Sequence, residues 1–148
     1  MEPNLTNLSR LLDEMFSLPS KDWTQYSPLT LAYVGDSIFD LVIRTVLVKR
    51  ANRPTAKLNH MASRIVCAPA QARLAKAILP FLTGEELSLY RRGCNASPAN
   101  KAKNATLEEY LEATGLETLL GCLYLQEKHE RMLSLIRQGL EITGAEMD

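Results

Sequence analysis

Residues 31–43 read Leu-Ala-Tyr-Val-Gly-Asp-Ser-Ile-Phe-Asp-Leu-Val-Ile, an apolar run that carries two carboxylates four residues apart. Ionised side chains are almost never fully buried without a partner, so Asp36 and Asp40 each require a counter-charge, a hydrogen-bond network or a metal ion. Arg44 follows Asp40 by one helical turn and supplies it with an i to i+4 ion pair. Asp36 has no such local cation, so its charge must be met from another element.

This run belongs to a long predicted helix in a protein that we predict to be all-α. The pair Ser27-Pro28 is a helix start signal, and the apolar pattern continues to about residue 49. The sequence has no hairpin signal and no sustained alternation of apolar and polar residues. The other predicted helices cover about residues 5–17, 54–65, 69–79, 83–92 and 106–125, and a last one carries the apolar residues between 132 and 142.

Two of these helices begin with a capping box, in which a threonine is followed three residues later by a glutamate. The pairs are Thr83 with Glu86 and Thr106 with Glu109. Residues 93–105 between them lack hydrophobic periodicity and collect small, polar and cationic side chains, so we predict a mobile, solvated loop there.

Length and composition indicate one compact domain over residues 1–148. No apolar stretch approaches the ~20 residues of a membrane span, and no secretion signal is evident, so we expect a soluble, cytoplasmic protein. The three cysteines fit neither a disulfide framework nor a zinc site, and we expect reduced thiols, with Cys67 and Cys122 packed as small apolar residues. His60 and His129 are expected to be surface or core residues rather than metal ligands.

The formal net charge of zero conceals a strong asymmetry along the chain. Residues 41–107 contain twelve Lys and Arg but only two acidic residues, a local charge of +10, and the remaining sequence carries −10. Such segregation is typical of a nucleic-acid-binding surface. Solvated helices that simply expose lysine and arginine would give the same pattern, and charge alone does not separate the two interpretations.

Glu117 poses the same problem as Asp36, because it is a lone carboxylate in a leucine-rich helix. Two such acids facing each other would repel unless a hard cation lay between them. Magnesium fits, since it takes oxygen ligands and is often held by one or two carboxylates together with water and substrate phosphate. The alternative is that both acids lie at helix edges in water.

Two motifs identify a family. The pattern Tyr-Val-Gly-Asp-Ser-Ile-Phe-Asp, residues 33–40, resembles the signature helix of ribonuclease III, Glu-Phe-Leu-Gly-Asp-Ala-Val-Leu-Asp. The later Glu-Thr-Leu-Leu-Gly-Cys-Leu-Tyr-Leu, residues 117–125, resembles that family's Glu-Ala-Leu-Ile-Gly-Ala-Ile-Phe-Leu. The run Arg-Arg-Gly-Cys-Asn-Ala, residues 91–96, is similar to the mini branch, which lacks a separate double-stranded RNA-binding domain. The similarity covers about residues 26–142.

The resemblance implies the helical fold of a ribonuclease III endonuclease domain, with Asp36 and Glu117 as catalytic, metal-binding carboxylates. Ala32 stands where the larger family usually has glutamate, and Thr114 stands where it usually has aspartate. Both departures resemble the mini branch and leave fewer direct metal ligands. A second magnesium site would then need water or substrate phosphate, with the Thr114 hydroxyl in a supporting role that positions water.

The implied activity is magnesium-dependent hydrolysis of double-stranded or structured RNA by a symmetric homodimer whose long helix lies at the two-fold interface. The implied substrate is a ribosomal RNA precursor of the 23S type, with no organic cofactor and no membrane. Expected RNA contacts are Arg91, Arg92, Asn95, Lys101, Lys103 and Asn104, and weaker candidates are Arg50, Arg53 and Lys57. Two alternatives are a catalytically silent ribonuclease III-like module that binds RNA or the ribosome, and a helical protein-interaction module.

Overall fold

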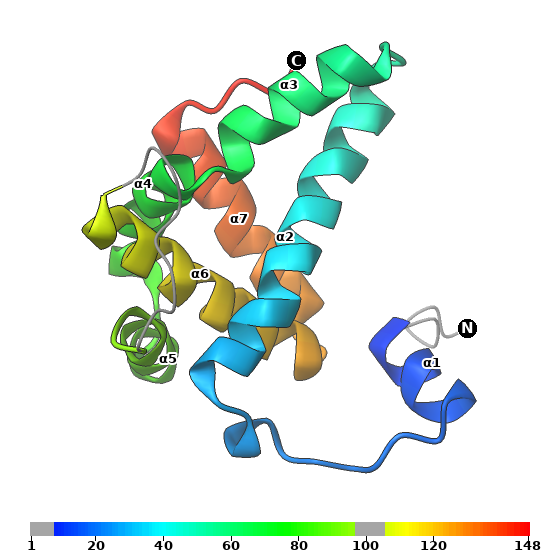
Figure 1. Cartoon of the computed structure of the whole chain (residues 1–148), viewed down its shortest axis with the longest axis vertical. Coiled ribbons are helices and arrows are strands. Elements are labelled where there is room, and N and C mark those ends of the chain that lie inside the picture. The colour runs from blue at the N-terminus through cyan, green and yellow to red at the C-terminus, as the bar shows by residue number, and fades with distance from the viewer. Residues whose placement is uncertain (1–7, 97–105) are drawn as a thin grey trace.

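The computed structural model describes residues 8–96 and 106–148, and these ranges contain helices and no strand, as predicted (Figure 1). The α-helices are α1 (Leu8–Met15), α2 (Pro28–Arg50), α3 (Thr55–Val66), α4 (Ala68–Ile78), α5 (Gly84–Cys94), α6 (Leu107–Leu125) and α7 (His129–Thr143). Two short 3-10 turns, η2 (Trp23–Gln25) and η3 (Leu79–Phe81), were not predicted. Within the ranges that are described, no helix is both long and apolar enough to cross a membrane.

The predicted helix starts are confirmed by their caps. The Ser27 hydroxyl accepts a hydrogen bond from the Thr30 backbone N–H at 3.2 Å, with proline at the first helical position of α2. Both capping boxes are complete, because in each one the threonine hydroxyl and the glutamate carboxylate accept from the other residue's backbone N–H. Local chemistry therefore determines where these helices begin.

The predicted loop starts later than expected, because α5 continues through Gly93 and Cys94. A Cβ atom at Gly93 would lie 2.4 Å from Thr118 Oγ1, so the missing side chain lets the last turn of α5 pack directly on α6. This tertiary contact extends the helix beyond the point where its own pattern fades. Residues 97–105 lie outside the described part of the chain.

Helix α6 forms the centre of the fold, and α2, α4, α5 and α7 all pack against it (Figure 1). Four of its leucines, Leu116, Leu119, Leu120 and Leu123, are at most 1% exposed. A helix that is apolar all round is expected to be enclosed by other elements. Truncating any of these leucines to alanine would cost about 2–5 kcal/mol, so α6 provides much of the core.

The closest approach of two helices occurs where α2 crosses α6. A Cβ atom at Gly35 would lie 1.8 Å from the Glu117 backbone oxygen, and one at Gly121 would lie 2.0 Å from the Leu31 backbone oxygen. Both neighbours are backbone atoms, which cannot rotate away as a side chain would. Glycine is therefore required on both sides of this crossing.

A partly buried ion pair ties α5 to α7. Arg131 donates to both Glu86 carboxylate oxygens, at 2.8 and 2.7 Å, and to the Phe81 carbonyl oxygen at 2.8 Å. The hydrogen bond from Arg131 is the main reason that the pKa of Glu86 lies below its ordinary value, against the opposing effect of burial. Glu86 thus completes a capping box and anchors α7 with one carboxylate.

The expectations for cysteine and histidine are partly confirmed. All three cysteines are free, and Cys122 is buried in the core as expected. The prediction for Cys67 is wrong: this residue is exposed, because it is the single extended residue that joins α3 to α4. His60 is exposed, and the His129 ring centroid lies 5.7 Å from that of Tyr124.

Helix α1 turns its apolar side away from the rest of the protein. Ser9 is its buried residue, and Arg10 forms an ion pair with Glu127 at 2.7 Å, near the end of α6. The exposed apolar side chains of this segment are Leu8, Leu11, Leu12, Met15, Phe16 and Leu18. The helix is amphipathic, as its spacing predicts, but its polar side is the one that contacts the protein.

Candidate active site

Two acidic residues from distant parts of the chain meet at the α2–α6 crossing. Asp36 follows Gly35 on α2, and Glu117 is the residue whose backbone oxygen faces Gly35 from α6. The Asp36 and Glu117 carboxyl groups lie close enough for each to affect the charge of the other. Asp36 is exposed and Glu117 is half-buried, so the pair lies at the edge of the core rather than inside it. The structure thus brings together the two acids that the sequence singles out.

Glu117 holds its proton more tightly than an ordinary glutamate does. Burial, the negative charge of Asp36 and the hydrogen bond from Glu117 to Asp36 raise the pKa of Glu117 to about 8. A hydrogen bond from the Gln71 amide has the opposite, smaller effect. Near neutral pH, therefore, Glu117 is largely protonated.

The oxygen atoms of this pair suit a hard divalent cation. In the described ranges no group of three or more His, Cys, Asp or Glu is placed to hold a metal ion, so a metal here would have two carboxylate ligands. Magnesium is commonly bound in this way, with water and substrate phosphate as the remaining ligands. The residues therefore fit such an ion, which would replace the proton of Glu117.

Ala32 and Thr114, the two departures from the larger family, add no carboxylate to the site. Ala32 is buried on α2, one turn before Asp36. The Thr114 hydroxyl donates to the Tyr110 backbone oxygen at 3.0 Å, one turn earlier on α6. Its proton is used there, so a water molecule at Thr114 would have to be the donor. The supporting role of Thr114 stays a prediction.

Gln71 is a polar neighbour of Glu117 that the sequence analysis missed. It lies on the first turn of α4 and is only 3% exposed. One signal was available, because Gln71 takes the first place in the i, i+3, i+4, i+7 pattern that Leu74, Ala75 and Ile78 complete. A long polar side chain on an apolar helix face indicates a specific partner.

Asp40 is not part of this site. Its carboxylate forms the predicted ion pair with Arg44, at 3.0 Å and partly exposed to water. Surface pairs of this kind stabilise a helix by about 0.3–0.5 kcal/mol. Asp40 therefore has a structural explanation that Asp36 lacks.

Part of the predicted RNA-contacting surface lies at the end of α5, which packs on α6. Arg91, Arg92 and Asn95 are exposed at the end of α5. The contact of Gly93 with Thr118 places this end of α5 next to the turn of α6 that carries Glu117. The other predicted contacts, Lys101, Lys103 and Asn104, lie outside the described residues.

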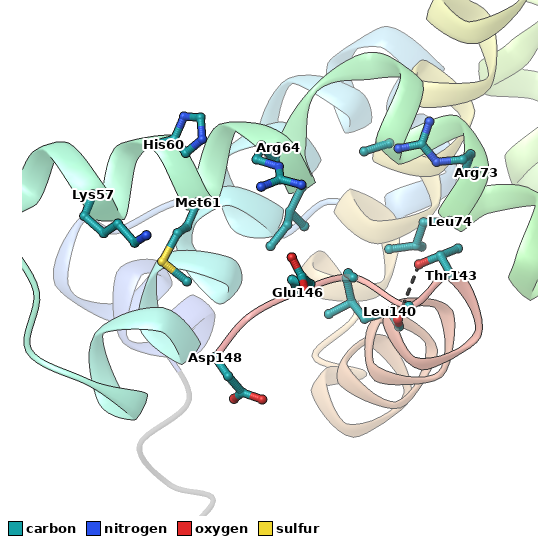
Figure 2. A pocket seen from close by; sticks show the side chains of 14 residues that line it. Lys57, His60, Met61, Arg64, Arg73, Leu74, Leu140, Thr143, Glu146 and Asp148 are labelled. Atoms are coloured by element: carbon teal, nitrogen blue, oxygen red, sulfur yellow. Dashed lines mark hydrogen bonds between the residues drawn. The ribbon is translucent and has the colours of Figure 1, made fainter.

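The weaker candidates are distributed over a second surface. Arg50 pairs with Asp148 at 2.6 Å, and an Arg53 N–H contacts the Met61 sulfur at 3.6 Å. Lys57 lines a cavity of about 550 Å³ between α3, α4 and the segment after α7 (Figure 2). Basic side chains of α3 and α4 and acidic side chains of the C-terminal segment share this cavity, so its charge is mixed.

Comparison with known proteins agrees with this geometry. Residues 29–128 match the model of the ribonuclease III domain, and this range contains both Asp36 and Glu117. The chain belongs to the ribonuclease III family. It is 41% identical to Mini-ribonuclease 3 of Enterococcus faecalis, over 84% of this chain and 96% of that protein. It is 34% identical to Mini-ribonuclease 3 of Staphylococcus aureus, over 80% of this chain and 90% of that protein.

A solved structure supports the same assignment. The crystal structure of a protein from Fusobacterium nucleatum superposes with a TM-score of 0.74 at 33% identity, over 84% of this chain and 98% of that one. Ribonuclease III enzymes are endoribonucleases that act on double-stranded RNA, typically as dimers and generally with a metal ion. This chain is therefore an endoribonuclease of the ribonuclease III type, in its mini branch.

Proposed function

We propose that the protein is a magnesium-dependent endoribonuclease that cleaves double-stranded or structured RNA at the Asp36–Glu117 pair. The observation that carries this proposal is the convergence of two carboxyl groups, 81 positions apart in the chain, at the α2–α6 crossing. A half-buried acid pair without a cation stabilises neither helix. Its arrangement is understandable as the ligand set of a metal ion.

Both carboxylates act as metal ligands in this mechanism. Mg²⁺, when bound, supplies an activated water molecule and stabilises negative charge on the leaving oxygen. Asp36 and Glu117 would hold the ion, which requires Glu117 to lose its proton. The rigid crossing at Gly35 and Gly121 keeps the two acids in register, so no reorganisation of the backbone is needed.

The RNA duplex is held by cationic and amide side chains at the end of α5 and in the residues that follow it. Arg91, Arg92 and Asn95 lie at the end of α5, from which residues 97–105 continue with Lys101, Lys103 and Asn104. Duplex RNA is recognised mainly through its shape, phosphates and 2′-hydroxyls, which suits such a surface. These six residues contact the backbone of the substrate.

A homodimer presents two such sites to the two strands of a duplex. Helix α2 supports this assembly, because it buries Leu31, Phe39 and Ile43 in its own core and still exposes a second apolar set. The exposed apolar side chains of α2 are Leu29, Tyr33, Leu41 and Val48. An isologous contact between two copies of α2 would remove this set from water.

The natural substrate that we infer is a ribosomal RNA precursor of the 23S type, processed in the cytoplasm. The similarity to the mini branch supports the substrate, and the three free thiols are consistent with a reducing compartment.

Cleavage of duplex RNA tests the proposal directly. The purified protein should cut a duplex in the presence of Mg²⁺ and stop when a chelator is added. Asp36→Asn and Glu117→Gln should each abolish cleavage and leave the far-UV circular dichroism unchanged, because both substitutions keep the side-chain shape. Asp40→Asn is the matched control on the same helix and should cleave like the wild type. Unchanged cleavage by Asp36→Asn would refute the assignment of the site.

The replacement of the usual acids by Ala32 and Thr114 favours a second candidate, a silent module that binds RNA without cutting it. The same assay separates the two functions. Tight binding of duplex RNA by the wild type with no cleavage, in Mg²⁺ or Mn²⁺, would establish the silent module.

A further inference from the structure

Gln71 has a buried amide oxygen that the fold alone does not explain. The side chain is 3% exposed, on the apolar face of α4. Leucine or methionine would fill this place without any polar atom to satisfy. Glu86 and Thr118 are also buried and polar, but their side chains bond to protein atoms and so have structural explanations.

The orientation of the Gln71 amide follows from its neighbours. Nε2 donates to the Val66 backbone oxygen at 2.8 Å. A carbonyl oxygen only accepts hydrogen bonds, so the amide nitrogen, and not the amide oxygen, must face Val66. The same amide lies close enough to Glu117 to favour its charged form, and a donor N–H is the group that does this.

The amide oxygen then has no donor within the described part of the protein. Gln71 Oε1 is buried and accepts no hydrogen bond from a protein group there. Buried polar atoms of this kind are rare in native proteins, and a bound water or ion is a common explanation. Because Oε1 and Nε2 belong to one small planar group, the oxygen lies close to the Glu117 carboxyl group.

We propose that Gln71 is a positioning residue of the metal site. Its N–H holds the Glu117 carboxylate in the orientation that binds the ion, and its Oε1 accepts a hydrogen bond from a water molecule of the ion's hydration shell. A neutral amide can do both, whereas a carboxylate would lack the donor and a lysine would lack the acceptor. This inference rests on the proposed function, because it requires a metal ion at the acid pair.

Gln71→Met tests the inference, because methionine is close to glutamine in size and has neither amide atom. Hydrogen bonds to metal ligands typically change metal affinity or activity by about 10–100-fold. We therefore expect the dissociation constant for Mn²⁺, measured by calorimetry, and the half-saturating Mg²⁺ concentration for cleavage to rise by at least about tenfold. Gln25→Met is the control: Gln25 is exposed on η2, and its variant should bind metal like the wild type.

The outcomes separate this inference from the proposed function. No Mn²⁺ binding and no cleavage by the wild type would reject the proposed function itself. Binding that Asp36→Asn abolishes and that a folded Gln71→Met leaves unchanged would overturn only the role of Gln71. If Gln71→Met does not fold, a wild-type crystal with Mn²⁺ decides: a metal-bound water within hydrogen-bond distance of Oε1 supports the proposal, and an unpartnered Oε1 beside the bound ion contradicts it.

Discussion

Glu117 is a carboxylic acid that the fold keeps protonated well above its ordinary pKa. Its pKa rises from 4.5 to about 8 because burial and Asp36 both disfavour its charge. Between pH 4.5 and about pH 8 the folded protein therefore holds a proton that the unfolded chain has lost. The free energy of unfolding falls as pH rises through that window. Below pH 4.5 the effect is absent, since the unfolded chain is protonated as well.

This linkage gives a prediction for Glu117→Gln, which keeps the shape and cannot ionise. Without metal, we expect the variant to be more stable than the wild type at pH 8 by about 2 kcal/mol, allowing for the water that reaches this edge of the core. The difference should shrink to near zero at about pH 4.5. Urea unfolding of both proteins from pH 4.5 to 8.5 measures this difference. Two parallel curves of stability against pH would contradict the raised pKa of Glu117.

At the scale of single residues, the sequence predicted the chemistry of charged groups better than that of neutral ones. Asp36 and Glu117 were evident as acids without local partners, and Arg44 was evident as the partner of Asp40. Gln71 carries no charge, so its residue type alone gave no reason to look for a partner. Its importance follows from burial and from the direction of its amide, which are tertiary properties.

At the scale of elements, helix boundaries followed the local signals except where a tertiary contact extended a helix. The caps at Ser27, Thr83 and Thr106 act through hydrogen bonds within a few residues, so the sequence determines them. The last turn of α5 depends instead on packing of Gly93 against α6, which no local pattern shows.

The crossing of α2 and α6 gives a prediction with an internal control. Gly121→Ala would place a methyl group 2.0 Å from the Leu31 backbone oxygen, so the helices must separate. We expect a loss of about 3 kcal/mol or more in the free energy of unfolding. Gly84→Ala meets nothing within 4 Å on the first turn of α5, and we expect it to be neutral or to stabilise by up to about 1 kcal/mol.

Chemical denaturation of the two alanine variants measures these changes, and equal stabilities would contradict the close crossing. Because the same crossing carries Asp36 and Glu117, any folded Gly121→Ala protein should also bind Mn²⁺ more weakly than the wild type. Gly84→Ala should leave metal binding unchanged.

At the scale of the whole molecule, the exposed apolar side chains of α2 lead to a prediction about assembly. Tyr33 is 84% exposed, and Tyr33→Glu would place a charge in the proposed two-fold contact. In sedimentation we expect the wild type to be a dimer and this variant a monomer. Ile142→Glu, at an exposed apolar position of α7, is the control and should remain a dimer. A wild type that sediments as a monomer at tens of micromolar would refute the proposed interface.

The charge distribution leads to a second prediction at this scale. A combined Arg91→Gln and Arg92→Gln variant should bind duplex RNA more weakly, because fewer RNA phosphates are neutralised. The slope of log affinity against log salt should become shallower by about 1 for each phosphate that no longer has a cationic partner. Arg137→Gln, at an exposed ion pair of α7, should change neither quantity. Binding is measured in a chelator, so that no cleavage occurs, and an unchanged slope would exclude α5 from the RNA surface.

The sequence by itself determined the helical class, the helix starts and the two acids that need an outside partner, because caps, periodicity and unpaired charge act over a few neighbouring residues. The tertiary structure alone decided that Asp36 and Glu117 face each other, that Gln71 is buried close to Glu117, and which half of α2 faces water. These facts depend on how closely two helices approach. That distance is determined by the backbone contact at Gly35 and Gly121, between residues far apart in the chain.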